Sequence, residues 1–298
     1  MLYIYTVCYN TPQYIEPQYK LLQKYIKNKF EYIVFNNTMT NSVITQNNSN
    51  NNNLLKNVCK KYNIKDVELP KNIFNGLSDN NASGRAGTAI NFSHKHLFSN
   101  YPLDSTFFLI DTDAFLINDF DVEKFMTNKK MSGRSQYRKG ATKTIKYITN
   151  HIVIYKPSCF DNSFQKYFSF LPCNIDSVNC DCGGNINYIF DGLEENEFVD
   201  WKNSIFSIEG NNKQLFGGSP TEDNEFDYNF LNSLDDKIKK FVLDDTKYLQ
   251  KKHPFCEIFT NTDNNTMFLH LRAGTNWIGF DFRRREILLR IFFDSILQ

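Results

Sequence analysis

Apolar and polar positions in the first part of the chain alternate between strand-like and helix-like spacing. Residues 2–7 form a short block of aromatic, aliphatic and β-branched side chains, which predicts a strand. Residues 15–28 carry apolar side chains at helical spacing, and residues 30–35 form a second strand-like block. A strand, a helix and a strand at this spacing predict a right-handed βαβ unit, so we expect a parallel sheet.

The same alternation continues to the middle of the chain and becomes more mixed after it. The further elements that spacing predicts are helices at 53–63, 86–98 and 282–297 and strands at 67–69, 106–109, 151–155 and 266–271. The asparagine-rich segment 47–53 has no apolar position, and we expect a solvated loop without function there. The pattern as a whole predicts an α/β protein with a mostly parallel sheet flanked by helices and a mixed second half.

The most informative stretch is a buried strand that runs into two acids. Residues 107–110 are all apolar and are followed by Asp111, Thr112 and Asp113. Two carboxylates at the end of a buried strand are costly unless a cation meets them, and they can converge on Mg²⁺ or Mn²⁺. Ligands of such open sheets bind at the carboxyl ends of the strands, where we also expect Tyr9, Asn10 and Asn36.

Composition excludes several classes of partner and location. A net charge of +1 over 298 residues argues against nucleic acid as a partner. Seven scattered cysteines argue against a disulfide framework and for a reducing compartment. The first residues are those of a strand rather than of a signal peptide, and no apolar run has the length of a transmembrane segment, so we expect a cytoplasmic protein.

Several of these residues resemble the motifs of a known family. A first strand with polar residues at its end, followed by the Asp-x-Asp of residues 111–113, resembles the GT-A type of nucleotide-sugar glycosyltransferase. The stretch Ser83-Gly84-Arg85-Ala86-Gly87 resembles the segment that carries the donor-binding arginine there. The resemblance implies a Rossmann-like GT-A fold in one domain, 1–298, with a nucleotide-sugar-binding half at 1–120 and an acceptor-binding and catalytic half at 121–298. It implies donor contacts by Thr6, Tyr9, Asn10, Asn36, Arg85, Asp111 and Thr112.

Two later stretches are similar to the glycogenin-like, retaining families. Residues 150–158 resemble the strand after the metal motif, which ends in Pro157-Ser158. Residues 270–277 resemble the late His…Gly…Trp motif, which implies that His270 joins Asp111 and Asp113 as a ligand of Mn²⁺ or Mg²⁺ and that Gly274 meets the diphosphate. This chain has Asn276 where the family usually has lysine, so the phosphate contact passes to Arg272. The motif favours retention over inversion.

The catalytic carboxylate has three candidates. Asp223 is preferred because residues 221–225 resemble an acidic helix start near the acceptor in other GT-A enzymes; Glu222 and Asp181 are the alternatives. The same acids could instead cap a helix that begins at Thr221. On the acceptor side the resemblance implies the turn at Gly183 and Gly184. Trp201 could stack on a sugar there, with core packing as the alternative.

The predicted function is transfer of a sugar from a nucleoside diphosphate donor, most simply a UDP-sugar, to a hydroxyl of a glycan, protein or lipid. Two alternatives stay open. One is a sugar nucleotidyltransferase, although residues 8–12 lack the glycine-rich loop that those enzymes carry. The other is a sugar-binding protein of the same fold without catalysis.

Overall fold

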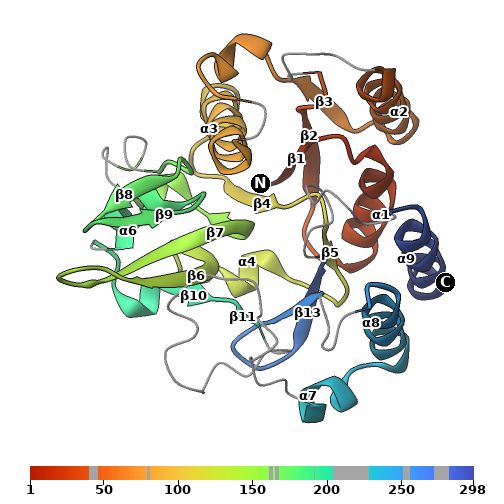
Figure 1. Cartoon of the computed structure of the whole chain (residues 1–298). Helices are drawn as coiled ribbons and strands as arrows, with labels where there is room; N and C mark the ends of the chain where they lie inside the picture. Colours follow the sequence, from red (N-terminus) through yellow and green to blue (C-terminus); the bar gives the residue numbers. More distant parts are fainter. Residues whose placement is uncertain are drawn as a thin grey trace.

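The computed structural model describes residues 1–39, 46–78, 81–160, 164, 168–190, 192–203, 228–250, 256–271 and 282–298, without the side chains of 203 and 282–285. It confirms the predicted fold class, because helices flank a mostly parallel central sheet (Figure 1). Strands from both halves of the chain take part in this sheet.

Within the described residues the central sheet has the strand order β10-β6-β7-β4-β1-β2-β3. The strands, in chain order, are β1 (Leu2–Cys8), β2 (Phe30–Asn36), β3 (Lys65–Glu68), β4 (Thr106–Ile110), β6 (Met131–Lys139), β7 (Thr144–Tyr155) and β10 (Phe198–Asp200). β1 to β4 are parallel to one another, β7 is antiparallel to both β4 and β6, and β10 is parallel to β6. The carboxyl ends of β1, β2 and β4 therefore meet at one edge of the sheet.

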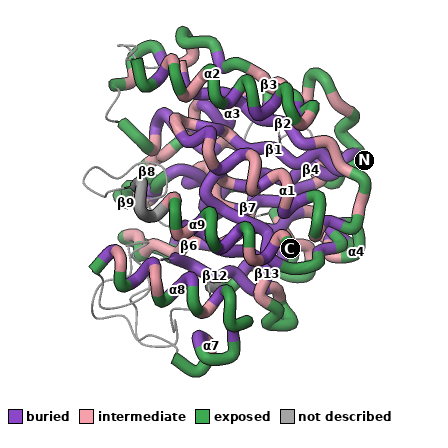
Figure 2. Tube along the Cα trace, turned by 90° about the vertical axis from the view of Figure 1, so that its right-hand side faces the viewer, coloured by how far each residue is buried: buried purple, intermediate pink, exposed green. Residues whose placement is uncertain are grey.

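The central strands are apolar because both faces of the sheet are covered. Leu2 and Ile4 of β1 pack with the helices α1 (Ile15–Tyr25) and α2 (Gln46–Tyr62), whereas Tyr3 and Tyr5 pack with α3 (Ala82–Asn100). Figure 2 shows β1, β4 and β7 as mostly buried segments behind the helices. Burial on both faces explains why the strands read as continuous apolar runs rather than as alternating ones.

A second, antiparallel sheet begins directly after the acidic turn. Its described strands have the order β11-β12-β13-β5, with β5 at Ala114–Leu116, β11 at Lys202–Asn203, β12 at Glu257–Thr260 and β13 at Thr266–His270. Phe115 and Leu269 are cross-strand partners and pack with α8 (Asp236–Tyr248) and α9 (Phe282–Leu297). The polypeptide thus changes sheets between Ile110 and Ala114, within the predicted metal motif.

One expectation about the helices is wrong. The asparagine-rich segment 47–53 is not a loop but the first half of α2, which begins at Gln46. Asn48 and Leu55 are both buried and lie seven residues apart, which is two helical turns. The helical period continues through this segment, but asparagines rather than apolar residues occupy its inner face.

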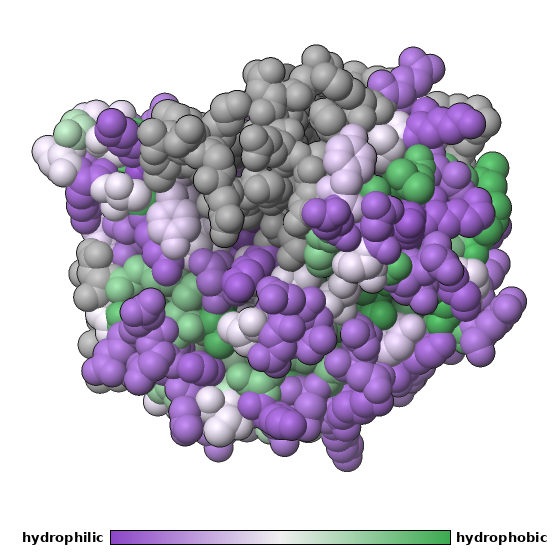
Figure 3. All heavy atoms as spheres, turned by 90° about the horizontal axis from the view of Figure 1, so that it is seen from below, coloured by the Kyte–Doolittle hydropathy of each residue, from purple (hydrophilic) through white to green (hydrophobic). Residues whose placement is uncertain are grey.

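The remaining elements are short. They are η1 (Pro12–Tyr14), η2 (Lys71–Phe74), α4 (Val122–Phe125), η3 (Pro157–Cys159), β8 (Cys173–Ile175), β9 (Val178–Cys180), η4 (Gly184–Ile186), α6 (Asn187–Phe190), η5 (Glu195–Glu197) and α7 (Tyr228–Ser233). Among the described residues, no helix combines the length and apolarity that crossing a membrane requires. On the coloured part of the face in Figure 3, hydrophobic side chains lie in small groups among hydrophilic ones.

Candidate metal and nucleotide site

The acidic turn after β4 lies where the two sheets meet. The Asp111 N–H donates to the His151 carbonyl at 2.7 Å and extends the β4–β7 ladder by one residue. The Ala114 N–H donates to the Asp111 carbonyl at 3.0 Å and closes the turn, after which β5 joins the second sheet. The Leu271 N–H donates to the Asp113 carbonyl at 2.9 Å. The backbone therefore places both acids at the junction of β4, β7 and β13.

A buried glutamine of α1 holds the backbone of this turn. The Gln18 amide nitrogen donates to the carbonyl oxygens of Asp111 at 2.8 Å and of Ala114 at 2.7 Å. The Tyr32 hydroxyl of β2 donates to the amide oxygen of Gln18 and so fixes which way the amide points. Both ends of the side chain are used, so α1 and β2 together set the path of the metal motif.

Two buried hydroxyls tie the turn to β1. The Thr112 hydroxyl donates to the Val7 carbonyl at 2.8 Å and lies 3.2 Å from the Thr6 hydroxyl. Because Thr112 has only one hydroxyl proton, Thr6 must be the donor of the second bond. Both threonine side chains are buried. They hold the turn in place, and the donor contacts expected of Thr6 and Thr112 stay predictions.

His270 lies among three charged side chains. Its Nδ1 is 2.7 Å from Glu257 of β12, and its Nε2 is 3.4 Å from Asp113 Oδ1. Arg134 of β6 donates to the other oxygen of Glu257 at 2.8 Å. Glu257 therefore orients the imidazole ring, as carboxylates commonly do for histidines that bind metals, and directs Nε2 toward the acidic turn.

A second histidine joins the acids. Side-chain ligand atoms of Asp111, His151 and His270 lie within 4.8 Å of one another. The two imidazole rings are in contact, with centroids 4.3 Å apart and ring planes inclined by 35°. One carboxylate and two imidazoles, with Asp113 beside them at 3.4 Å from His270 Nε2, form a donor set for a divalent ion such as Mn²⁺, so the residues fit the kind of metal that the sequence predicts.

The ionisation of this cluster shows how strongly it favours positive charge. Burial, and next the charge of Asp113, raise the pKa of Asp111 to about 7 despite the opposing effect of His270. Burial acts to lower the pKa of His270, but Asp113 and Glu257 outweigh it and raise the pKa to about 10. At neutral pH a protonated imidazole therefore supplies the cation that the carboxylates require.

Asparagines form a second, uncharged edge beside the ends of β1 and β2. Asn10 has a backbone φ of +55°, which asparagine tolerates better than most residues. Asn48 of α2 donates to the Asn10 side chain at 3.1 Å, and Asn51 donates to the Asn10 carbonyl at 3.2 Å. The inner face of α2 thus holds the loop after β1. We call Asn10, Asn36, Asn48, Asn51 and Asn52 the amide edge.

Asn36 belongs to this edge as a positioning residue. Its amide oxygen accepts from the Thr38 N–H at 3.1 Å, and its amide nitrogen donates to Asn52 at 2.7 Å. It is only 1% exposed. The side chain therefore holds the end of β2 against α2, and its expected contact with a donor stays a prediction. Tyr9 and Asn10 are partly exposed.

The loop that carries Asp181 lies beside the start of α3. Asp181 is exposed and accepts from its neighbour's N–H and from the Ser83 hydroxyl. Gly183 has a φ of +96°, and a Cβ there would lie 1.9 Å from the Ile148 carbonyl, so only glycine fits. Gly183 and Gly184 are both buried. Gly183 therefore lets the loop pack closely against β7, and Gly184 lets it pack against Cys173 of β8 and Cys180 of β9.

Two other predicted residues are buried and contact aromatic rings. The Arg85 guanidinium lies 4.4 Å from the centre of the Phe74 ring, and the residue is 6% exposed. Trp201 is 2% exposed and stacks on Phe125 at 4.8 Å, with Phe268 against its edge. The Trp201 ring is part of the core, which was the alternative to its contact with a sugar. Four further predicted residues, Glu222, Asp223, Arg272 and Gly274, lie outside the described residues.

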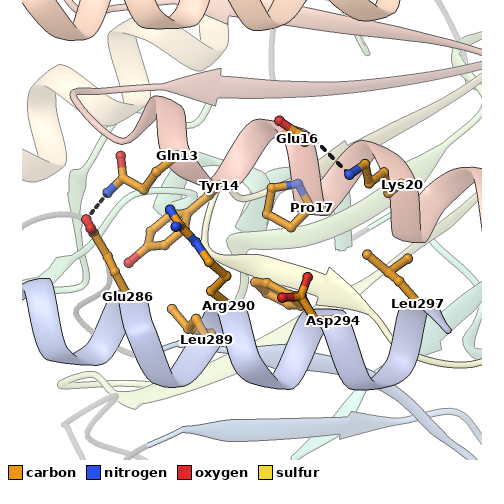
Figure 4. Close-up of a pocket in the computed structure, with 11 residues that line it drawn as sticks. Gln13, Tyr14, Glu16, Pro17, Lys20, Glu286, Leu289, Arg290, Asp294 and Leu297 are labelled. Carbon is orange, nitrogen blue, oxygen red and sulfur yellow. Dashed lines mark hydrogen bonds and ion pairs between the residues drawn. The ribbon is translucent and has the colours of Figure 1, made fainter.

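A hollow of about 340 Å³ lies elsewhere, between α1 and α9 (Figure 4). Pro17 and Leu289 contribute apolar surface, and Gln13 donates to Glu286 across the gap at 2.9 Å. None of the residues predicted for the site lines it. Its lining combines acidic, basic and apolar side chains and does not indicate a particular class of ligand, so the metal cluster remains the candidate site.

Comparison with known proteins gives only distant similarity. No family model matches the chain, and no curated protein matches it. Among solved structures it is similar to the galactosyltransferase LgtC in complex with donor and acceptor sugar analogues, with 12% identity and a TM-score of 0.40 over 69% of this chain and 74% of that one. It is also similar to the mannosyltransferase Ktr4p from S. cerevisiae, with 10% identity and a TM-score of 0.38 over 56% and 58%.

A third similar structure is core-mannan synthase A (CmsA/Ktr4) from Aspergillus fumigatus in its Mn/GDP form. The identity is 12% and the TM-score 0.34, over 56% of this chain and 62% of that one. Similarity at this level does not assign the chain to a family. The function must therefore rest on the site itself.

Sequence reasoning missed three residues around the metal cluster. Gln18 gives no sequence signal, because a glutamine on a helix is usually exposed. Glu257 and His151 could have been found only from strand pairing, since each contacts the site through a residue distant in sequence. The strands that end at Asp111 and begin at His151 were both predicted, but the register that sets these two residues opposite each other was not.

Proposed function

We propose that the protein is a metal-dependent glycosyltransferase that moves a sugar from a nucleoside diphosphate donor to an acceptor hydroxyl. The observation that carries this proposal is the convergence of Asp111, Asp113 and His270 at the end of a buried parallel strand, beside the amide edge. Acids and imidazole suit a divalent ion and its diphosphate, and amides suit the hydrogen-bonding edges of a nucleotide base. A UDP-sugar is the donor that we propose first.

The metal-binding residues would be Asp111, Asp113 and His270. When bound, the ion would stabilise the negative charge that develops on the departing diphosphate. The chain's own residues prepare this site: Gln18 fixes the turn, and Glu257 holds His270 with Nε2 directed to Asp113. Mn²⁺ or Mg²⁺ would meet the charge requirement of the two acids.

For the other residues we propose the roles that the sequence motifs predict. Tyr9 and Asn10 would contact the nucleoside, and Arg85, Arg272 and Gly274 would face the diphosphate and the sugar. The acid that acts on the acceptor hydroxyl or on the anomeric carbon would be Asp223, with Glu222 and Asp181 as alternatives. Of these acids, Asp181 is the one within the described residues, and Ser83 joins its loop to the first turn of α3, which carries Arg85. The acceptor would be a glycan, a glycoprotein or a glycolipid, and retention is the preferred outcome.

Turnover of a panel of nucleotide-sugars tests the proposal. The protein, freed of metal with EDTA, is incubated with UDP- and GDP-sugars and with Mn²⁺ or Mg²⁺, and the released nucleotide is measured. We expect slow hydrolysis of one donor that requires the metal, and a rise in Tm with UDP plus Mn²⁺ together.

Other outcomes identify the alternatives. Formation of pyrophosphate from a nucleoside triphosphate and a sugar phosphate would indicate a nucleotidyltransferase. A rise in Tm without turnover of any donor or acceptor pair would indicate a binding protein. Neither turnover nor a change in Tm would contradict the proposal.

A further inference from the structure

We propose that His151 is a further protein ligand of the metal ion, and that the centre therefore selects a divalent transition metal such as Mn²⁺ or Co²⁺ over Mg²⁺. The inference rests on the metal centre of the proposed function but not on the transfer of a sugar. It adds a second imidazole to the set that Asp111, Asp113 and His270 provide.

Strand pairing sets His151 opposite the first acid. β4 and β7 are antiparallel, with Ile110 opposite Ile152, so the next pair along the ladder is Asp111 and His151. The 2.7 Å bond from the Asp111 N–H to the His151 carbonyl confirms this register. Side chains of directly opposed residues project from the same face of a sheet and lie within about 5.5 Å at their Cβ atoms.

The second sheet brings His270 to the same point. His270 Nδ1 is held by Glu257 at 2.7 Å, which leaves Nε2 to face the cluster. The ligand atoms of Asp111, His151 and His270 already lie within 4.8 Å of one another. Ligands of one ion at about 2.1 Å are roughly 3 to 3.5 Å apart, so closure requires only side-chain movement of about an ångström.

The chemistry of the donor set determines which metal it prefers. Mg²⁺ takes oxygen ligands in a strict octahedral arrangement and keeps several of its waters. Imidazole nitrogen is a poor ligand for Mg²⁺ and binds the first-row transition ions better, modestly for Mn²⁺ and more strongly for Co²⁺ and Zn²⁺. One histidine among carboxylates leaves the preference weak, whereas two histidines on one ion favour the transition metals.

A packing role for His151 is the alternative to be tested. Its ring stacks near Phe259, with centroids 6.4 Å apart, and contacts the His270 ring. A residue that only packs could be replaced by another ring. His151→Phe therefore keeps the aromatic contact and removes both nitrogens, and His151→Gln is a second variant that keeps polarity instead.

The experiment measures metal binding without any nucleotide. The metal-free full chain is titrated with Co²⁺ followed by visible absorption, with Mn²⁺ followed by EPR, and with Mg²⁺ by competition against Mn²⁺. Pulsed EPR of the Mn²⁺ form counts the imidazole nitrogens coupled to the ion. We expect two in the wild-type protein and one in His151→Phe, with a loss of Mn²⁺ and Co²⁺ affinity of about tenfold or more and little change for Mg²⁺.

The matched control is His96→Phe. His96 is another partly buried histidine that stacks on a phenylalanine, Phe92, but it lies on α3 outside the metal cluster. We expect its metal binding to equal that of the wild-type protein.

Each outcome has one meaning. A single coupled imidazole in the wild-type protein, or unchanged Mn²⁺ binding in His151→Phe and His151→Gln, would overturn the role of His151 and leave the proposed function standing. Two coupled imidazoles without turnover of any nucleotide-sugar would support His151 as a metal ligand and would contradict the proposed sugar transfer. If the wild-type protein bound no metal, both the role of His151 and the proposed metal-dependent function would be contradicted.

Discussion

The two edges of the candidate site bury polar groups in different ways. We call Asp111, Asp113, His151, His270 and Glu257 the metal edge. In it His270 contacts both Asp113 and Glu257, all three are almost fully buried, and Arg134 pairs with Glu257. The amide edge buries neutral side chains that satisfy one another through hydrogen bonds, as Asn48 does with Asn10. Charges buried in this way remain stable only with a counter-ion, whereas satisfied amides need none.

This difference has a functional consequence. Binding at the metal edge must depend on the ion and on pH, because a proton on His270 and a metal ion compete for the same nitrogen. Binding at the amide edge must depend only on the positions of neutral donors and acceptors. Substitutions in the two edges should therefore affect different steps, and the following predictions separate them.

The largest effect is expected for Asp113→Ala. Asp113 borders the metal cluster and is the ion-pair partner of His270 Nε2. Its loss removes a carboxylate from the metal and one of the two acids that raise the pKa of His270, while Glu257 still holds the imidazole ring, so the fold should survive. We expect no measurable rise in Tm with UDP plus Mn²⁺ and at least about hundredfold weaker Mn²⁺ binding, measured by EPR.

The control for this variant is Asp119→Ala. Asp119 is exposed and forms a surface ion pair with Lys27 at 2.7 Å, and such pairs contribute little. Its metal and donor binding should match the wild-type protein. Donor affinity that survives Asp113→Ala would show that the metal centre is elsewhere.

The next effect in size concerns pH. The metal requires Asp111 ionised and His270 neutral, and their pKa values are raised to about 7 and about 10. Each proton released on binding strengthens binding about tenfold per pH unit. Mn²⁺ affinity should therefore rise by up to about a hundredfold per unit below pH 7 and by about tenfold per unit between pH 7 and 9, measured by EPR titration.

The stability of the metal-free protein should change in the opposite direction. A carboxyl whose folded-state pKa is raised, such as Asp111, favours the folded state when protonated and loses that contribution as the pH rises from about 4 toward 7. His270 contributes stability below its unfolded pKa of about 6.5 and loses it as the pH rises through about 10. Urea unfolding of the wild-type protein and of Asp111→Asn at pH 5, 7 and 9 measures the first contribution, and pH-independent Mn²⁺ binding would contradict the proposed ligands.

How far each edge can be predicted depends on which interactions build it. Local spacing predicts β1, β2 and β4, because strands buried on both faces are continuous apolar runs. The acids of the metal edge follow directly from the end of β4. His151 and Glu257 reach the same point through strand pairs that join positions 40 and 13 residues apart, and spacing along the chain does not specify such pairs.

The part of the amide edge that lies on α2 was missed for a different reason. Helix α2 has asparagines on its inner face, and a binary pattern of apolar and polar residues has no means of distinguishing a polar side chain that faces solvent from one that faces other amides. Asparagine is also a weak helix former, so propensity adds no support. The period is present in the positions of Asn48, Asn52 and Leu55, but only the contacts with Asn10 and Asn36 reveal it.

The smallest effect is expected for Asn48→Ala in the amide edge. Asn48 holds the left-handed Asn10 and also donates to the Thr38 carbonyl at 3.4 Å. Removing a net hydrogen bond of about 1 kcal/mol should weaken UDP binding about fivefold, because the loop after β1 loses its fixed position. Mn²⁺ binding without nucleotide should stay unchanged, since no charge of the metal edge is touched. Calorimetric titration with UDP, with and without Mn²⁺, measures both.

Asn50→Ala makes this last prediction specific, because Asn50 lies on the same helix but is exposed. Helix propensity changes equally in the two variants, so a loss common to both would reflect the stability of α2 rather than the amide edge. A loss of UDP affinity in Asn48→Ala alone would assign the nucleoside to the loop after β1. If UDP affinity were unchanged in both variants while Asp113→Ala still lost UDP and Mn²⁺ binding, the metal edge would bind the donor without this amide edge. The nucleoside would then bind elsewhere.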